Sequence, residues 1–300
     1  MVREKLIRIE NKMTSLEAII QATIDGLLTG ALYALIAIGL AMIWGIVEII
    51  NFAHGEFLMI ASFLSYFLYT YLGIDPIASI PLAFATSFAL GFLVQKFIIN
   101  RILDAPFLSQ VFATFALLLI LRNGFFVAMG PDVRAIYTWY SEYVIDLYGI
   151  RIGLVKVIAV VIVVISVILL HLFLTRTFLG TAMRGLSQDK TAAQLIGVNI
   201  KNVYSLAFGI GAGLAGISGA LLASFYYIYP EMGVPFTLIA FIAVVLGGFG
   251  NILGPALGAI IIGLVQNLGA LIVSPSMKDI LVYLVFLFIL LIKPTGIISR

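Results

Sequence analysis

The chain has 300 residues, of which 63% are hydrophobic and 10% are charged, and its formal net charge is +3. Soluble proteins carry about 25% charged residues, and so few charges cannot cover the polar surface of a soluble domain of this length. The composition, with a mean hydropathy of +1.19, therefore excludes a soluble enzyme and a disordered chain, and predicts a protein embedded in lipid.

The first 20 residues differ from the rest of the chain. Apolar residues recur there at spacings of three and four, with basic and acidic residues between them. The pattern fits an amphipathic helix lying on the membrane surface, and it fits a frayed tail equally well. It lacks a compact apolar region before a small-residue cleavage site, so we do not expect a signal peptide. We therefore divide the chain into this segment, 1–20, and a transmembrane domain, 21–300.

Apolar segments long enough to cross a bilayer follow in turn. In hydrocarbon the backbone hydrogen bonds must be made within the segment, so each is expected to be a helix. The candidates are 24–47, 57–72, 77–99, 108–129, 153–174, 203–229, 252–273 and 279–293. A further stretch, 235–247, is too short to span alone. The predicted fold class is all-α, a polytopic membrane protein with about eight transmembrane helices, or nine if this stretch crosses.

Two interruptions divide the apolar segments, and we expect broken or re-entrant helices at both. The first is the polar hexapeptide 51–56, and the second is the glycine-rich run 247–255. Broken helices in the two halves of a transporter point to the transport site. The candidate path or hinge residues are Asn51, His54, Glu56, Gly247, Gly248, Gly250, Gly254 and Pro255. Ionisable groups at membrane depth are energetically costly, so we expect these residues to have a structural or functional role. For the three polar residues we favour capping or hinge-setting, with solute contact as the alternative.

Charges in the loops predict the orientation. The hydrophilic segment 175–202 carries four basic residues against one acid, and the 96–107 loop carries Lys96 and Arg101, so both are expected in the cytoplasm. The aromatic 130–152 loop fits the outer face. Three apolar segments separate the N-terminus from the 96–107 loop. Either the chain around 51–72 is re-entrant, or the N-terminus lies outside.

The 175–202 loop contains the pattern of two short helices, with Gly197 ending the second. A rigid amphipathic pair in the cytoplasm can transmit the movement of a docked partner to the spanning helices. A plain solvated connector is the alternative interpretation.

Motifs for catalysis are missing from the sequence. It contains no phosphate-binding G-x-x-x-x-G-K-[ST] loop, no G-x-S-x-G, no H-E-x-x-H and no cysteine, and its histidines are His54 and His171. We therefore expect no catalytic residues, no metal site, no cofactor and no nucleic-acid partner.

The loop resembles the coupling loop of ABC-transporter permeases, and in particular the branched-chain amino acid permease family of the LivH/LivM type. The matching residues are Arg184, Gly185, Asp189, Ala192, Ala193 and Gly197. The segments 33–39 with 50–57, 243–256 and 293–297 are similar to other signatures of this family. The resemblance spans about residue 22 to the C-terminus, and a longer charged N-terminal extension departs from it.

The resemblance implies a non-catalytic translocation subunit, multi-pass in the cell (inner) membrane. Its partners would be a second, similar (LivM-like) permease subunit, two cytoplasmic ABC ATPases, and an extracytoplasmic protein that binds branched-chain or other hydrophobic amino acids. A permease for urea or short amides is the alternative within the family. An ion-coupled secondary transporter is the alternative outside it, with Asp25, Glu48 and Glu56 as the candidate coupling acids.

Overall fold

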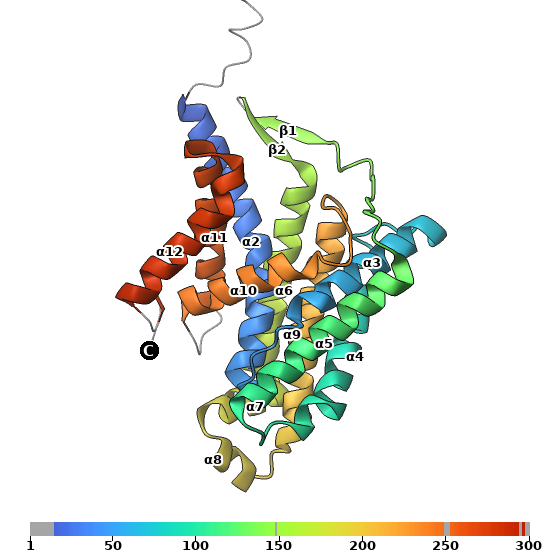
Figure 1. Cartoon of the computed structure of the whole chain (residues 1–300), viewed down its shortest axis with the longest axis vertical. Coiled ribbons are helices and arrows are strands. Elements are labelled where there is room, and N and C mark those ends of the chain that lie inside the picture. The colour runs from blue at the N-terminus through green and yellow to red at the C-terminus, as the bar shows by residue number, and fades with distance from the viewer. Residues whose placement is uncertain (1–14, 148, 249–252, 294–295, 298–300) are drawn as a thin grey trace, which may run out of the picture.

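The computed structural model of the chain describes residues 15–147, 149–248, 253–293 and 296–297. It is a bundle of helices with one small hairpin at one end (Figure 1). The helices are α2 (Ser15–Val47), α3 (His54–Leu72), α4 (Ile80–Phe97), η1 (Ile99–Arg101), α5 (Phe107–Met129), α6 (Leu154–Arg176), α7 (Phe178–Gln188), α8 (Lys190–Leu195), α9 (Ile200–Ala223), α10 (Gly233–Gly247), α11 (Leu253–Ile272), η2 (Pro275–Met277) and α12 (Lys278–Ile292). The antiparallel strands β1 (Val144–Leu147) and β2 (Ile150–Gly153) pair Val144 with Gly153.

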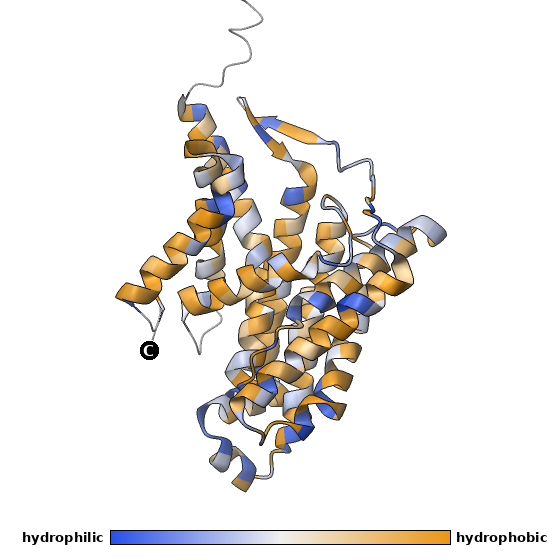
Figure 2. Ribbon diagram, in the orientation of Figure 1, coloured by the Kyte–Doolittle hydropathy of each residue, from blue (hydrophilic) through white to orange (hydrophobic). Residues whose placement is uncertain are grey.

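Eight helices within the described ranges are long and apolar enough to cross a membrane. They are α2, α3, α4 with η1, α5, α6, α9, α11, and α12 with η2, whereas α10 is shorter. This confirms the predicted fold class and the count of eight. Figure 2 shows apolar residues along all of these helices and hydrophilic residues gathered around α8.

The first helix begins earlier than the hydropathy predicts. The 33 residues of α2 are continuous from Ser15, so residues 15–20 of the predicted surface segment form its first turns. At 1.5 Å per residue, α2 is about 50 Å long, which exceeds the thickness of the hydrocarbon core. The rest of the predicted amphipathic segment, residues 1–14, lies outside the described residues.

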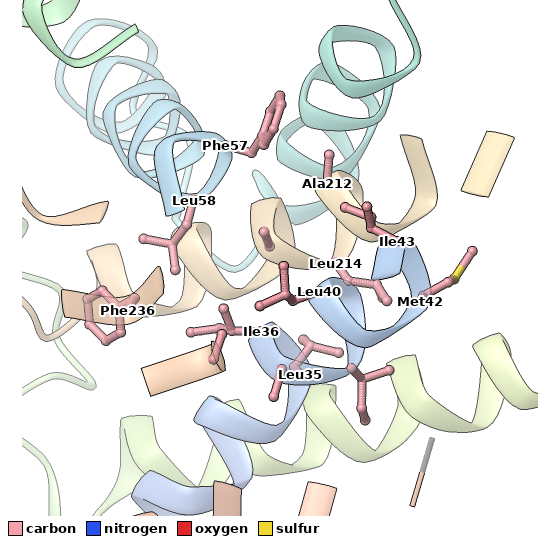
Figure 3. Close-up of a cluster of buried hydrophobic side chains, with 14 of the residues drawn as sticks. Leu35, Ile36, Leu40, Met42, Ile43, Phe57, Leu58, Ala212, Leu214 and Phe236 are labelled. Carbon is pink, nitrogen blue, oxygen red and sulfur yellow. The ribbon is translucent and has the colours of Figure 1, made fainter. Parts of the chain in front are cut away.

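The core of the bundle lies between α2, α3, α9 and α10 (Figure 3). Leu35, Ile36 and Leu40 of α2 meet Leu58 of α3 and Leu214 of α9 there, and all five are fully or almost fully buried. In the most apolar stretch of α9, 89% of the residues are buried, against 17% in α5 and 6% in α12. The peripheral helices therefore present long apolar faces that suit lipid or a second membrane subunit.

Hydrogen bonds at the hairpin fix the direction of α2. The Gln21 side chain donates to the carbonyl oxygen of Arg151 at 2.8 Å and accepts from its backbone N–H, also at 2.8 Å. The Lys156 Nζ lies 2.7 Å from the Asp25 carboxylate. These contacts are at the start of α6, and α7 follows its far end about 35 Å away. The start of α2 therefore lies on the opposite side of the bundle from α7 and α8.

Both predicted helix breaks are present. The first helix ends at Val47, Glu48 has a left-handed backbone with φ 61°, and α3 begins at His54. The His54 side chain reaches the carbonyl oxygen of Ile36, which lies 11 residues before the end of α2. That offset corresponds to about 16 Å along the helix axis, so α3 starts partway through the bundle. The second break separates α10, ending at Gly247, from α11, starting at Leu253.

Candidate functional site: the two helix breaks and the α7–α8 pair

The first break holds three buried polar side chains, Asn51, His54 and Glu56, none of which is exposed to solvent. Asn51 Oδ1 accepts a hydrogen bond from the Ala53 N–H at 3.1 Å, and the His54 N–H donates to the Asn51 carbonyl oxygen at 3.3 Å. An asparagine that bonds backbone two residues on forms a local turn. Asn51 therefore sets the turn that precedes α3, whose N-cap residue is Ala53 and has no side-chain cap.

His54 ties this turn to α2. Its Nε2 lies 3.0 Å from the carbonyl oxygen of Ile36, and because a carbonyl can only accept, Nε2 carries the proton. The bond reaches a carbonyl inside α2 and holds the start of α3 against that helix.

Several polar atoms of the first break have no hydrogen-bond partner in the described part of the chain. They are Asn51 Nδ2, His54 Nδ1, and both carboxylate oxygens of Glu56. A buried polar group without a partner costs about 1–3 kcal/mol, and more if it is charged. Residues 51–53 thus form a turn and residues 54–56 begin α3, and their side chains keep polar atoms that the described part of the chain leaves without a hydrogen bond.

Gly55 brings α3 against the start of α10. Its N–H donates to Thr237 Oγ1 at 2.8 Å, and a Cβ at this position would lie 2.0 Å from the carbonyl oxygen of Gly233. Sequence reasoning missed Gly233 and Thr237, because they lie about 180 residues from the hexapeptide and carry no local motif.

The second break is a close approach of α10 and α11. A Cβ on Gly247 would lie 2.0 Å from the carbonyl carbon of Gly254, so the backbones touch there. Pro255 is buried beside it, Gly248 has a φ of 90°, and Gly250 lies outside the described residues. The Ile297 N–H donates to the Leu246 carbonyl oxygen at 2.8 Å and fastens the C-terminal segment to this turn.

The structure does not bring the two breaks together. The first contacts α10 at Gly233 and Thr237, whereas Gly247 lies ten residues further along the same helix. That spacing corresponds to about 15 Å. The candidate path residues therefore form two separate groups joined by α10.

The segment 175–202 folds as the two predicted short helices. Side-chain caps begin both, because Thr177 Oγ1 accepts from the Gly180 N–H at 3.0 Å and Asp189 Oδ1 from the Ala192 N–H at 2.9 Å. A third cap, Asn199 Oδ1 to the Asn202 N–H at 3.1 Å, begins α9. The chain leaves α8 through Gly197, whose φ of 87° strains any other residue.

One face of this pair is packed on the bundle and the other is open. Met183 and Leu186 are buried, and so is Ala193, one of the six predicted coupling residues. The other five, Arg184, Gly185, Asp189, Ala192 and Gly197, are exposed. Leu195 and Ile196 are 83% and 82% exposed at the end of α8. Exposed apolar side chains beside charged ones are typical of a docking surface for another protein.

A groove of about 380 Å³ separates α8 from the η1 region. Asn100 and Asp104 line one side, and Lys190, Gln194 and Lys201 line the other. The 96–107 and 175–202 loops therefore lie on the same side of the bundle, as their basic residues predict.

Comparisons with known proteins agree with this architecture. Residues 22–290 match the family described as branched-chain amino acid transport system / permease component. The chain is 32% identical to the high-affinity branched-chain amino acid transport system permease protein BraD of Pseudomonas aeruginosa, over 94% of this chain and 96% of that protein. It is 30% identical to the permease protein LivH of Escherichia coli K12 over the same shares. No solved structure shows significant similarity to it.

A more distant relative is a probable branched-chain amino acid transport permease protein LivH of Methanocaldococcus jannaschii, 26% identical over 89% of this chain and 88% of that protein. The family match covers all eight candidate spans and both breaks, apart from the outermost turns at either end. The chain is therefore a multi-pass membrane protein that belongs to the family of branched-chain amino acid transport permease components.

Proposed function

We propose that the chain is the membrane-spanning subunit of an ATP-driven importer for branched-chain and other hydrophobic amino acids, in the cell (inner) membrane. The named relatives, which match over nearly their whole length, support this substrate class. In this proposal the chain forms the translocation path and performs no chemistry, and ATP is hydrolysed by separate subunits.

The observation that carries the proposal is the capped α7–α8 pair, which offers Leu195 and Ile196 to a partner. A cytoplasmic ATPase docked on this pair moves α7, and α7 follows α6 directly through Thr177. A Cβ on Gly180 would lie 2.2 Å from the Phe173 carbonyl oxygen, so the two helices are in backbone contact. Such a contact transmits a displacement of α7 to α6 almost unchanged, because packed interiors barely compress.

Two further partners complete the proposed complex. A second, similar permease subunit covers the apolar faces of the peripheral helices, and an extracytoplasmic binding protein delivers the solute. Asn51, His54 and Glu56 with the 247–255 turn form the path or its hinges in this proposal.

The test is uptake by proteoliposomes that contain the chain, its partner permease and the ATPases, with binding protein and radiolabelled leucine outside. We expect uptake that requires enclosed ATP and is abolished by an ATPase variant unable to hydrolyse it. Uptake driven by an ion gradient without ATP would contradict the proposal in favour of a secondary transporter. Uptake of urea or acetamide with no uptake of leucine would contradict the proposed substrate.

A further inference from the structure

We propose that Glu56 of α3 and Arg122 of α5 form a two-ended site for the charged head group of the solute. In this site Glu56 receives the ammonium group of an α-amino acid and Arg122 receives its carboxylate. The inference rests on the proposed transport function and deepens it, because it selects a zwitterion over the neutral urea or amide.

Packing places the two residues at the same depth. Ala53, just before α3, clusters with Leu117 and Leu118 of α5, and further along, the rings of Phe63 and Phe125 are 5.3 Å apart. The two helices therefore run in parallel, side by side (Figure 1). Along the chain, Glu56 lies between Ala53 and Phe63, and Arg122 lies between Leu118 and Phe125.

Neither charge is neutralised by the described part of the chain. Both Glu56 carboxylate oxygens are buried without a hydrogen-bond partner. Arg122 is half-buried, and the ion pairs among the described residues are Arg151–Asp146 and Lys156–Asp25. An acidic and a basic side chain thus lie on neighbouring helices at similar depth, and the ion pairs of the described residues do not include them.

This arrangement matches the chemistry of an amino acid. Ionisable side chains at membrane depth are costly unless something pairs with them, and such residues mark solute paths. A zwitterion carries its ammonium and carboxylate on one carbon, so a single molecule can pair with both side chains. An aromatic group lies one turn before Glu56, where Phe52 has ring centroids 6.3 Å from Phe115 and 5.4 Å from Phe241. It offers apolar surface to a hydrophobic side chain.

Access requires α5 to move. Glu56 is fully buried, but α5 itself is held by few contacts, and its buried residues are Thr114, Leu117 and Leu118. Separation of α5 from α3 during the transport cycle would open the carboxylate and the guanidinium to the same space. Alternating exposure of a site near the membrane midplane is how such proteins move a solute.

The test uses the reconstituted complex of both permease subunits, ATPases and binding protein, with the variants Glu56→Gln and Arg122→Gln. Each charge-assisted contact that is lost should lower leucine uptake about 10- to 100-fold. The melting temperature of the purified complex and the amount of bound ATPase should stay at the wild-type level. Glu142→Gln and Arg151→Gln change exposed residues of the same types and should leave uptake unchanged.

The double variant Glu56→Gln with Arg122→Gln separates solute binding from a structural ion pair. Solute binding predicts uptake at or below that of either single variant, again without loss of thermal stability. The proposal is overturned if the single variants retain uptake, if they lose stability together with uptake, or if the double variant restores uptake. Failure of the wild-type complex to transport leucine would count against the proposed function instead.

Discussion

Gly55 lies where α3 crosses α10, and there is no room there for the methyl group of an alanine. Because the nearest atom to an added Cβ is the backbone oxygen of Gly233, neither helix can avoid it by a rotamer change. We expect Gly55→Ala to destabilise the protein by about 1–3 kcal/mol through forced separation of the helices. Thermal unfolding of the detergent-purified protein measures this.

The matched control is Gly124→Ala in α5, where an added Cβ meets no atom within 4 Å. Alanine is the better helix former, so this variant should be neutral or stabilised by up to about 1 kcal/mol. Equal melting temperatures for the two variants would show that the α3–α10 contact is not as close as described.

A second residue-scale prediction concerns Tyr140 in the loop between α5 and α6. Its side chain is 3% exposed, and its hydroxyl donates to Asp75 Oδ1 at 2.7 Å. Hydrogen bonds to charged groups contribute about 1.5–3 kcal/mol, so Tyr140→Phe should lower the free energy of unfolding by that amount. Tyr137→Phe is the control, because that side chain is 74% exposed and should have no measurable effect.

The same pair makes stability depend on pH. Burial, and then the hydrogen bond to Asp75, raise the pKa of Tyr140 above its ordinary value. The folded protein thus holds this proton more tightly than the unfolded chain, where tyrosine titrates at about pH 10. The resulting stability is fully present below pH 10 and is lost as the pH rises further. Between pH 9 and 11 the melting temperature of wild type should therefore fall more steeply than that of Tyr140→Phe, and parallel curves would contradict this.

At the scale of elements, the proposed docking requires α8 to be formed before the ATPase binds. Asp189 caps this short helix, and loss of a cap costs about 1 kcal/mol. If that loss is fully transmitted to docking, Asp189→Ala should reduce ATPase binding about fivefold, measured by co-purification at limiting ATPase. Asp189→Asn keeps the cap without the charge and should bind like wild type. Equal loss in both variants would assign the effect to the charge instead.

Sequence patterns predicted the elements well where lipid or local hydrogen bonding decides them. Apolar runs had to be helices, and the polar hexapeptide and the glycine run predicted interruptions between them, because such residues disfavour a continuous lipid-exposed helix. The first interruption lies at 48–53, slightly earlier than predicted, because His54, Gly55 and Glu56 already belong to α3. The α7–α8 pair was also recognisable, since Asp189 and Gly197 are ordinary start and stop residues.

Contacts between distant elements were not predictable in the same way. The bonds between Gln21 and Arg151, which set the direction of α2, join side-chain and backbone groups 130 residues apart. The Gly55–Gly233 approach and the parallel pairing of α3 with α5 likewise depend on how whole helices pack.

At the scale of the whole molecule, the two ends of the bundle along the membrane normal carry different elements. The start of α2 and the β1–β2 hairpin lie at one end, and α7 and α8 at the other (Figure 1). If the basic 175–202 loop lies in the cytoplasm, as its charges predict, then Ser15 lies outside, which is the second of the two N-terminal alternatives raised by the sequence. A solute delivered from outside then reaches the first break before the docking pair.

The most direct test of this account is the sidedness of the α7–α8 pair. The chain has no cysteine, so single cysteines can be introduced without removing others. Ser187→Cys near α8 and Trp139→Cys in the outer loop both change exposed residues. In intact cells expressing the chain without the ATPases, a membrane-impermeant maleimide should label Trp139→Cys, and should label Ser187→Cys only after permeabilisation. Labelling of Ser187→Cys in intact cells would place the docking pair beyond the reach of ATP and contradict the account.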